Sequence, residues 1–157
     1  MFLVDTNVFV YAVNHDAPER EACLPLLGQW HARIAPWYTT WQIIYEFLRV
    51  TTHARVFPRP LSIAEAWQFI AALLASPGLR ILGETPRHPA TAAAVFDAHP
   101  HLAGSILHDA HTVILMREHG IRRIYTRDAD FNRFSDLEVI DPLAGSGTSA
   151  RSSGTRR

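Results

Sequence analysis

The chain has 157 residues, a length typical of one domain, and 48% of them are hydrophobic, enough to form a buried core. Fifteen basic and fifteen acidic residues give a formal net charge of zero, so the charge of the whole chain gives no argument for nucleic-acid binding. All fifteen basic residues are arginine, which excludes enzyme classes that need a lysine beside a phosphate.

Targeting features are absent from the sequence. No apolar run reaches the ~18 residues that a membrane helix needs. The N-terminal segment lacks the basic start and the small-residue cleavage site of a signal peptide. With a single cysteine, Cys23, the chain cannot form an internal disulfide. These observations predict a cytoplasmic protein without a membrane partner.

The opening residues predict a buried strand that ends on an acid. Residues 2–4 form a short apolar run, which fits a strand covered on both faces. Asp5 then falls at the carboxyl end of the strand, the edge at which ligands bind in open parallel sheets. Thr6 and Asn7 are helix-capping residues, and they predict a helix that continues to Val13. An acid at this junction needs a cation or a base beside it.

Helices and strands alternate along the rest of the chain. The pattern predicts helices over residues 18–33, 41–52, 62–75, 87–99 and 105–119, and strands over residues 34–38, 79–82, 122–125 and 137–140. This alternation predicts an α/β fold with a mainly parallel sheet. One domain is expected over residues 1–143. Residues 144–157 contain no apolar residue larger than alanine, so they are expected to form a disordered tail.

Five acids fall at one edge of the predicted sheet. Asp5 and Asp128 each follow a strand, and Asp130 comes two residues later. Asp109 lies in the first turns of a late helix, and Glu46 reaches the same edge if its helix packs beside the first strand. Two carboxylates ~4 Å apart repel by about 4 kcal/mol at an effective dielectric constant near 20. Oxygen ligands of this kind suit Mg²⁺ or Mn²⁺, and a metal held by them can activate water for phosphodiester hydrolysis.

Each acid also has a purely structural interpretation. Asp5 could cap the first helix, and Glu46 could be a solvated helix residue. Asp109 could interact with the N-terminus of its own helix, while Asp128 and Asp130 are common turn residues. These roles are compatible with metal binding, so a structural role for one acid does not remove the cluster.

The sequence indicates less specific roles for several aromatic residues and arginines. The predicted apolar face of the helix over residues 41–52 consists of Trp41, Ile44, Tyr45 and Leu48. Four aromatic residues are interpreted as core or dimer contacts and not as platforms for stacking bases: Trp37, Trp41, Tyr45 and Trp67. The candidate phosphate contacts are Arg49, Arg127 and Arg133, for which exposure on the surface is the default interpretation.

The order and spacing of these segments resemble the PIN domain. The segments that carry the resemblance are residues 2–7, Glu46, residues 108–110, residues 126–131 and residues 139–143. The resemblance covers residues 1–143, and within the family the size is similar to that of VapC-type toxins from bacterial toxin–antitoxin pairs. It implies a three-layer α/β/α fold around a mainly parallel sheet.

The same resemblance implies a magnesium-dependent endoribonuclease in which Mn²⁺ can replace Mg²⁺. It places the catalytic, metal-binding quartet at Asp5, Glu46, Asp109 and Asp128, a fifth metal ligand at Asp130, and orienting polar residues at Thr6, Asn7 and Thr126. It further implies a homodimer, a cognate antitoxin protein that covers the site, and an RNA substrate that is expected to be a tRNA or an rRNA.

Other functions match parts of this pattern. Haloacid-dehalogenase-like phosphatases also open with a strand and an Asp, but Asn7 stands where they have a second Asp. Those phosphatases and response-regulator receivers use a lysine that the chain lacks, and P-loop enzymes need a Gly-Lys-Ser/Thr segment that is also missing. A DNA nuclease of similar fold ranks lower because no DNA-binding module accompanies it. The main alternative is a non-catalytic RNA- or protein-binding module, which has no use for clustered acids.

Overall fold

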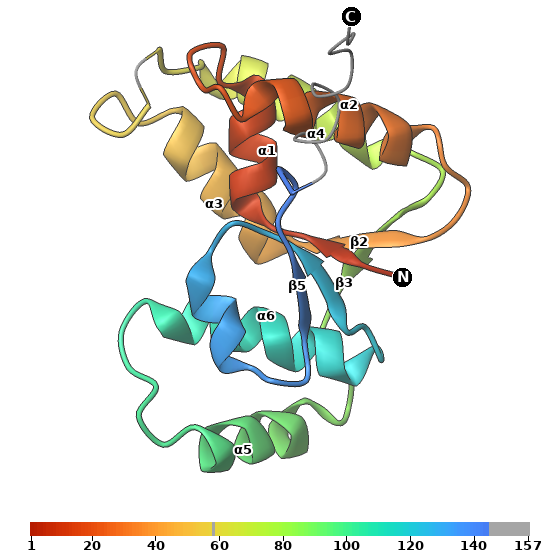
Figure 1. Ribbon diagram of the computed structural model, residues 1–157, viewed down its shortest axis with the longest axis vertical. Helices are drawn as coiled ribbons and strands as arrows, with labels where there is room; N and C mark the ends of the chain where they lie inside the picture. The colour runs from red at the N-terminus through yellow and green to blue at the C-terminus, as the bar shows by residue number, and fades with distance from the viewer. Residues whose placement is uncertain (58, 145–157) are drawn as a thin grey trace, which may run out of the picture.

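The structure is a computed structural model that describes residues 1–57 and 59–144 and has three layers (Figure 1). The central sheet contains β1 (Leu3–Val4), β2 (Trp37–Thr40), β3 (Leu79–Leu82), β4 (Arg123–Tyr125) and β5 (Glu138–Ile140). The strands are parallel throughout and lie in the order β3-β2-β1-β4-β5. The predicted α/β class with a parallel sheet is therefore confirmed.

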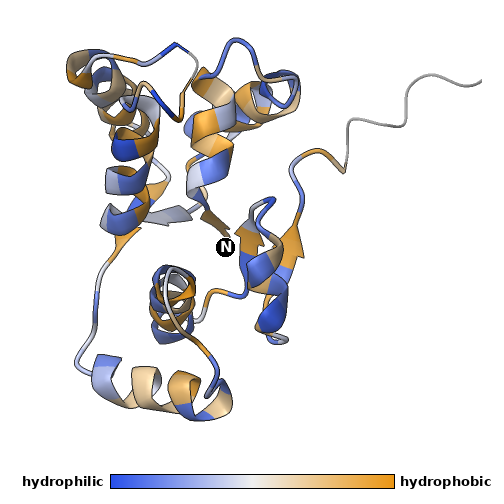
Figure 2. Cartoon of the chain, turned by 90° about the vertical axis from the view of Figure 1, so that its left-hand side faces the viewer, coloured by the Kyte–Doolittle hydropathy of each residue, from blue (hydrophilic) through white to orange (hydrophobic). Residues whose placement is uncertain are grey.

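Helices cover both faces of this sheet, as the view in Figure 2 shows. One layer consists of α1 (Thr6–Val13), α2 (Arg20–His31), α3 (Trp41–Thr51) and α4 (Ile63–Leu74), and the other contains α5 (His88–Ala98), α6 (Ile106–Glu118) and the short 3₁₀ helix η1 (Ala129–Arg133). The chain moves outward from β1 to β3 and then returns past β1 to β4. Because parallel crossovers are right-handed, this reversal of direction moves the later helices to the opposite face.

The reversal also creates a crevice beside the first strand. β1 pairs with β2 on one side and with β4 on the other, with Leu3 opposite Ile124 and Val4 opposite Tyr125. The Asp5 backbone N–H donates to the Tyr125 carbonyl at 3.1 Å, so the two strands end level with each other. In open α/β sheets, ligands bind at such a point beyond the carboxyl ends of the strands.

The core fills the space between the sheet and the two helical layers. Leu3, Val4 and Ile124 are fully buried in the central strands. The Phe2, Trp30 and Tyr125 rings pack together with centroids 4.7–5.0 Å apart. None of the helices in the described residues has the length and apolar character required to cross a bilayer.

Several predicted boundaries differ from the structure. The strand expected at residues 34–38 is β2, which begins at Trp37, because Ile34 is 84% exposed and precedes the part that pairs with β3. The helix expected at residues 18–33 is the shorter α2, and the 3₁₀ helix η1 was not expected. Of the expected tail over residues 144–157, only Ala144 is described, and its N–H donates to the Asp141 carbonyl at 3.1 Å; residues 145–157 lie outside the described part of the chain.

Candidate active site

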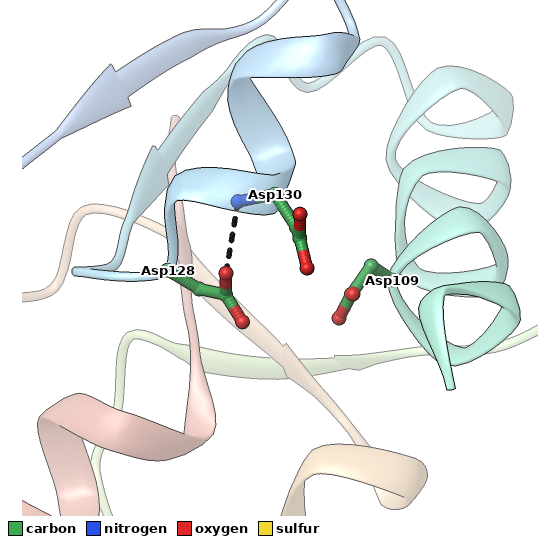
Figure 3. A group of neighbouring side chains, drawn as sticks. All are labelled: Asp109, Asp128 and Asp130. Carbon is green, nitrogen blue, oxygen red and sulfur yellow. Dashed lines mark hydrogen bonds between the residues drawn. The ribbon is translucent and has the colours of Figure 1, made fainter. Parts of the chain in front are cut away.

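Three acids from two parts of the chain converge beside the sheet. Asp109 projects from the start of α6, and Asp128 and Asp130 project from the turn between β4 and η1 toward it (Figure 3). One carboxylate oxygen from each of the three residues lies within 4.8 Å of the others. Among the described residues, this is the one group of three or more His, Cys, Asp or Glu side chains with ligand atoms so close together.

Two adjoining cavities connect this group with the other two predicted acids. A cavity of about 250 Å³ is lined by Asp5, Glu46, Asp109 and Asp128, together with Thr6 and Asn7. A second cavity, of about 570 Å³, shares three of these acids and adds Asp130, and its wall also includes Gln42, Tyr45, Arg49, Ser105 and His108. All five acids that the sequence placed at one edge of the sheet therefore lie around this pair of cavities.

Asp5 is held by a network of polar residues at the point where β1 ends. Its Oδ1 accepts from the Thr6 N–H at 2.7 Å, so Asp5 is the N-cap of α1, as its structural interpretation expected. Thr6 is the first residue of the helix and not its cap. Its Oδ2 accepts from the Thr126 hydroxyl at 2.7 Å and from Asn7 Nδ2 at 2.8 Å. Asn7 Oδ1 in turn accepts from the Arg127 N–H at 3.2 Å, which connects α1 to the turn after β4.

The same threonine orients Asp128. Thr126 Oγ1 accepts from the Asp128 backbone N–H at 2.9 Å and from Asn7 Nδ2 at 2.8 Å while it donates to Asp5. One donated and two accepted hydrogen bonds use the full capacity of a hydroxyl group. Asp128 Oδ1 accepts from the Asp130 N–H at 2.9 Å and so begins η1. Asp5 therefore caps α1 and Asp128 caps η1, which are the structural roles considered from the sequence. Both side chains nevertheless line the same cavity.

Glu46 enters the site because α3 packs against α1. The Thr6 hydroxyl contacts Glu46 Oε2 at 3.4 Å, and Arg49 Nη2 lies 3.5 Å from Glu46 Oε1. On the other side, Arg133 Nη2 lies 3.1 Å from Asp130 Oδ1. These two ion pairs are largely exposed, so each is worth little energetically. They leave most of the negative charge of the cluster uncompensated.

The electrostatics of the cluster favour binding of a cation. Burial raises the pKa of Asp5 to about 6, and the charges of Glu46 and Asp128 add to this shift, against the hydrogen bonds from Thr126 and Thr6 that lower it. Burial also raises the pKa of Asp109 to about 7, and the neighbouring carboxylates, Asp128 foremost, raise it further. Both groups would become more acidic if a positive charge were placed among them.

A sequence profile of the PIN domain matches residues 2–137. The chain belongs to the PIN domain family. It is 31% identical over 142 residues to Ribonuclease VapC48 of Mycobacterium tuberculosis, an alignment that covers 90% of this chain and 97% of that protein. The membership and this relative identify the chain as a PIN domain ribonuclease, so the non-catalytic alternative is set aside.

Two solved structures have a fold similar to that of this chain. VapC20 of Mycobacterium tuberculosis, described as a Sarcin-Ricin loop cleaving toxin, has a TM-score of 0.62 at 19% identity and covers 85% of this chain and 95% of that one. VapBC2 from Rickettsia felis, bound to a DNA fragment from its promoter, has a TM-score of 0.60 at 13% identity and covers 88% of this chain and 96% of that one. At these identities the likeness concerns the fold alone.

The donor set of this PIN domain fits a hard divalent cation. The converging atoms are carboxylate oxygens, which Mg²⁺ and Mn²⁺ prefer. The one cysteine, Cys23, is fully buried in the core on α2, so it offers no soft ligand to the site. The residues that could hold a metal are Asp109, Asp128 and Asp130, with Asp5 and Glu46 along the same cavities.

Gln42 belongs to this site, although no pattern in the sequence pointed to it. Gln42 Nε2 donates to the His108 carbonyl at 3.1 Å, and Gln42 Oε1 lies 2.5 Å from His111 Nδ1. Gln42 therefore connects α3, which carries Glu46, with the start of α6, which carries Asp109. Its position one turn before Glu46 was visible in the sequence, but its partners on α6 were not, because they lie 66 and 69 residues away.

Proposed function

We propose that this PIN domain ribonuclease is a Mg²⁺-dependent endoribonuclease and the toxin component of a type II toxin–antitoxin system, with Mn²⁺ able to replace Mg²⁺. The observation that carries the proposal is the convergence of Asp109, Asp128 and Asp130 within 4.8 Å, beside Asp5 and Glu46. Such a cluster is costly unless a cation neutralises it. The proposed nuclease domain comprises residues 1–143.

In the proposed mechanism, Asp5, Glu46, Asp109 and Asp128 form the catalytic and metal-binding set, and Asp130 adds a further carboxylate. A divalent ion bound there would supply Lewis-acid chemistry and a water of lowered pKa for attack on a phosphodiester bond. The protein contributes the fixed positions of the acids. Thr126 and Asn7 hold the Asp5 carboxylate, Thr126 also holds the Asp128 backbone, and Thr6 contacts Glu46.

The partners belong to the same proposal. The substrate is RNA, which we expect to be a tRNA or an rRNA, and a cognate antitoxin protein would cover the site. The description of VapC20 as a loop-cleaving toxin and the VapBC2 structure support the toxin role and a protein partner. A homodimer remains a prediction from the resemblance, and a cytoplasmic location remains a prediction from the sequence features described above.

The test is cleavage of cellular RNA by the purified chain with Mg²⁺, with Mn²⁺ and with a chelator, followed by sequencing of the new RNA ends. We expect cleavage with either metal, none with the chelator, and none by Asp5→Asn, whose fold should survive. Asp97→Asn, at an exposed position of α5, is the matched control and should cleave normally. Full cleavage by Asp5→Asn, or cleavage without metal, would reject the proposed mechanism. DNA tested in parallel should remain intact.

The toxin role is tested separately in cells. Expression of the wild type should slow growth, Asp5→Asn should not, and co-expression of the neighbouring gene product should restore growth. A wild type that cleaves RNA in vitro without any effect on growth would leave the nuclease part of the proposal standing and remove the toxin part.

A further inference from the structure

Two large aromatic side chains lie exposed on the helix that carries Glu46. Trp41 is 46% exposed and Tyr45 is 67% exposed, and their ring centroids are 6.2 Å apart. Of the two interpretations, core or dimer contact, the core one is therefore wrong for Trp41 and Tyr45. The buried face of α3 is formed instead by Ile43, Ile44, Phe47, Leu48 and Thr51. We call Trp41 and Tyr45 the aromatic shelf.

The aromatic shelf adjoins the cluster of acids. Tyr45 lines the cavity of about 570 Å³ together with Glu46, Asp109, Asp128 and Asp130. It also directly precedes Glu46 on α3, so the ring lies at the edge of the proposed catalytic group. An apolar, flat surface is thus continuous with a strongly acidic cavity.

A positively charged side chain, that of Arg49, lies at this edge of the cavity. Arg49 follows Tyr45 by four residues, so Trp41, Tyr45 and Arg49 lie at the spacing of one helical stripe. Arg49 lines the same cavity, and its side chain is 65% exposed. The contact with Glu46 uses one nitrogen of the Arg49 guanidinium group, which has five N–H donors.

These features match the chemistry of an unpaired nucleotide. Proteins hold single-stranded RNA by stacking bases on exposed aromatic rings, and every base offers a flat face for this contact. A guanidinium group binds phosphate through a planar pair of N–H groups. A base in a duplex is already stacked and paired, so it cannot use such a shelf.

We propose that Trp41 and Tyr45 form a stacking subsite for an unpaired base beside the scissile phosphate, with Arg49 contacting a neighbouring phosphate. This inference rests on the proposed RNA cleavage and adds to it the residues that select single-stranded substrate. The competing occupant of the same surface is a second protein chain, and the test below separates the two.

The experiment measures binding of a labelled single-stranded RNA of mixed sequence, and of the same RNA annealed to its complement, to the Asp5→Asn protein with Mg²⁺. Added Trp41→Ala or Tyr45→Ala should each weaken single-strand binding by roughly 5- to 100-fold. Trp41→Phe and Tyr45→Phe should retain most of the binding, whereas Tyr45→Leu, which is apolar but not flat, should not. The Asp5→Asn protein should bind the duplex more weakly than the single strand, and the added substitutions should change duplex binding little.

Trp67→Ala provides the matched control. Trp67 is 45% exposed on α4 but does not line the acidic cavities, so its loss should leave RNA binding unchanged. An equal loss in Trp67→Ala, or an equal loss for duplex RNA, would contradict stacking at the shelf.

Two further outcomes would overturn the inference in distinguishable ways. If the wild type cleaves RNA but both alanine variants bind single strands normally, the shelf has no role in RNA binding, and the proposed function stands. A change from dimer to monomer in Tyr45→Ala without loss of RNA binding would assign the surface to a second copy. If the wild type neither cleaves nor binds RNA with Mg²⁺, the proposed function fails together with the subsite.

Discussion

The Thr126 hydroxyl donates to the Asp5 carboxylate at 2.7 Å, across 121 positions of the sequence. The same oxygen accepts the Asp128 backbone N–H, so one buried threonine connects an acid after β1 with an acid after β4. This hydroxyl group therefore adds a direct side-chain link between the two acids to the pairing of β1 with β4.

Thr126→Val, which keeps the shape and removes the hydroxyl, should lower both stability and activity. It leaves the Asp128 N–H and the Asp5 carboxylate with one partner fewer, at a cost of about 1–3 kcal/mol in the free energy of unfolding. Urea unfolding and the RNA cleavage rate measure the two effects. Thr51→Val is the matched control, since Thr51 is equally buried but donates to the Phe47 carbonyl within α3. Equal behaviour of the two variants would argue against a role for Thr126 in the site.

Stability without metal should decrease as the pH rises from about 4 to about 7. Asp5 and Asp109 have pKa values of about 6 and about 7 in the folded protein against 3.8 ordinarily, so the folded state binds more protons than the unfolded state in this range. For Asp5 the change amounts to about 3 kcal/mol.

Urea unfolding of the wild type and of Asp5→Asn across this pH range isolates the contribution of Asp5. The difference in stability between variant and wild type should grow in favour of the variant as the pH rises. Mg²⁺ should reverse the trend in the wild type because it binds the ionised, folded site. A difference independent of pH would show that Asp5 titrates normally.

Gln42→Ala should weaken the response to Mg²⁺ without unfolding the protein. The side chain joins α3 to the His108 carbonyl and to His111, and so fixes Glu46 relative to Asp109. Loss of a residue that orients metal ligands typically weakens metal binding 10- to 100-fold. We expect the Mg²⁺ concentration for half-maximal cleavage to rise by about ten-fold, with little change in the rate at saturating metal.

Gln68→Ala is the control for this experiment, because Gln68 is an exposed residue of α4 outside both acidic cavities. An unchanged Mg²⁺ response in Gln42→Ala would mean that packing of α3 alone positions Glu46. A reduced rate at every Mg²⁺ concentration would indicate a role beyond metal binding.

Glu118→Ala should destabilise the fold far more than Glu118→Gln. The buried Glu118 carboxylate accepts from the Thr85 N–H and hydroxyl and pairs with His88 Nδ1 at 2.7 Å, joining the end of α6 to the start of α5. Removing one partner of a buried pair typically costs about 3–5 kcal/mol, whereas glutamine keeps an acceptor for Thr85. Thermal and urea unfolding measure the difference, and equal stability of the two variants would contradict it.

The pH dependence at Glu118 should have the opposite sign to that at Asp5. Burial by itself raises the pKa of Glu118, but hydrogen bonds from Thr85 and His88 outweigh it and hold the pKa below its ordinary value. A carboxyl with a lowered pKa stabilises the fold above the ordinary value of 4.5, and this contribution is lost as the pH falls below it. Comparison of the wild type with Glu118→Gln below and above that pH tests the sign.

Much of the fold was predictable from local patterns. The capping box at Ser62 and Glu65 starts α4 as such a pattern predicts, because both partners lie within one turn. The boundary of β2 was not predictable in the same way, since it depends on where the strand pairs with β3. Sequence periodicity located α3, but it assigned Trp41 and Tyr45 to the buried face together with Ile44 and Leu48.

The sequence by itself determined the types of the elements, their order and the positions of acids where strands end, because these features depend on neighbouring residues. The tertiary structure decided that β4 returns beside β1, which brings Asp5 next to Thr126 and Asp128. It also decided which stripe of α3 faces solvent. Periodicity shows which residues share a face of a helix, but only the packing of other helices against it determines which face is covered, and that packing joins residues far apart in the chain.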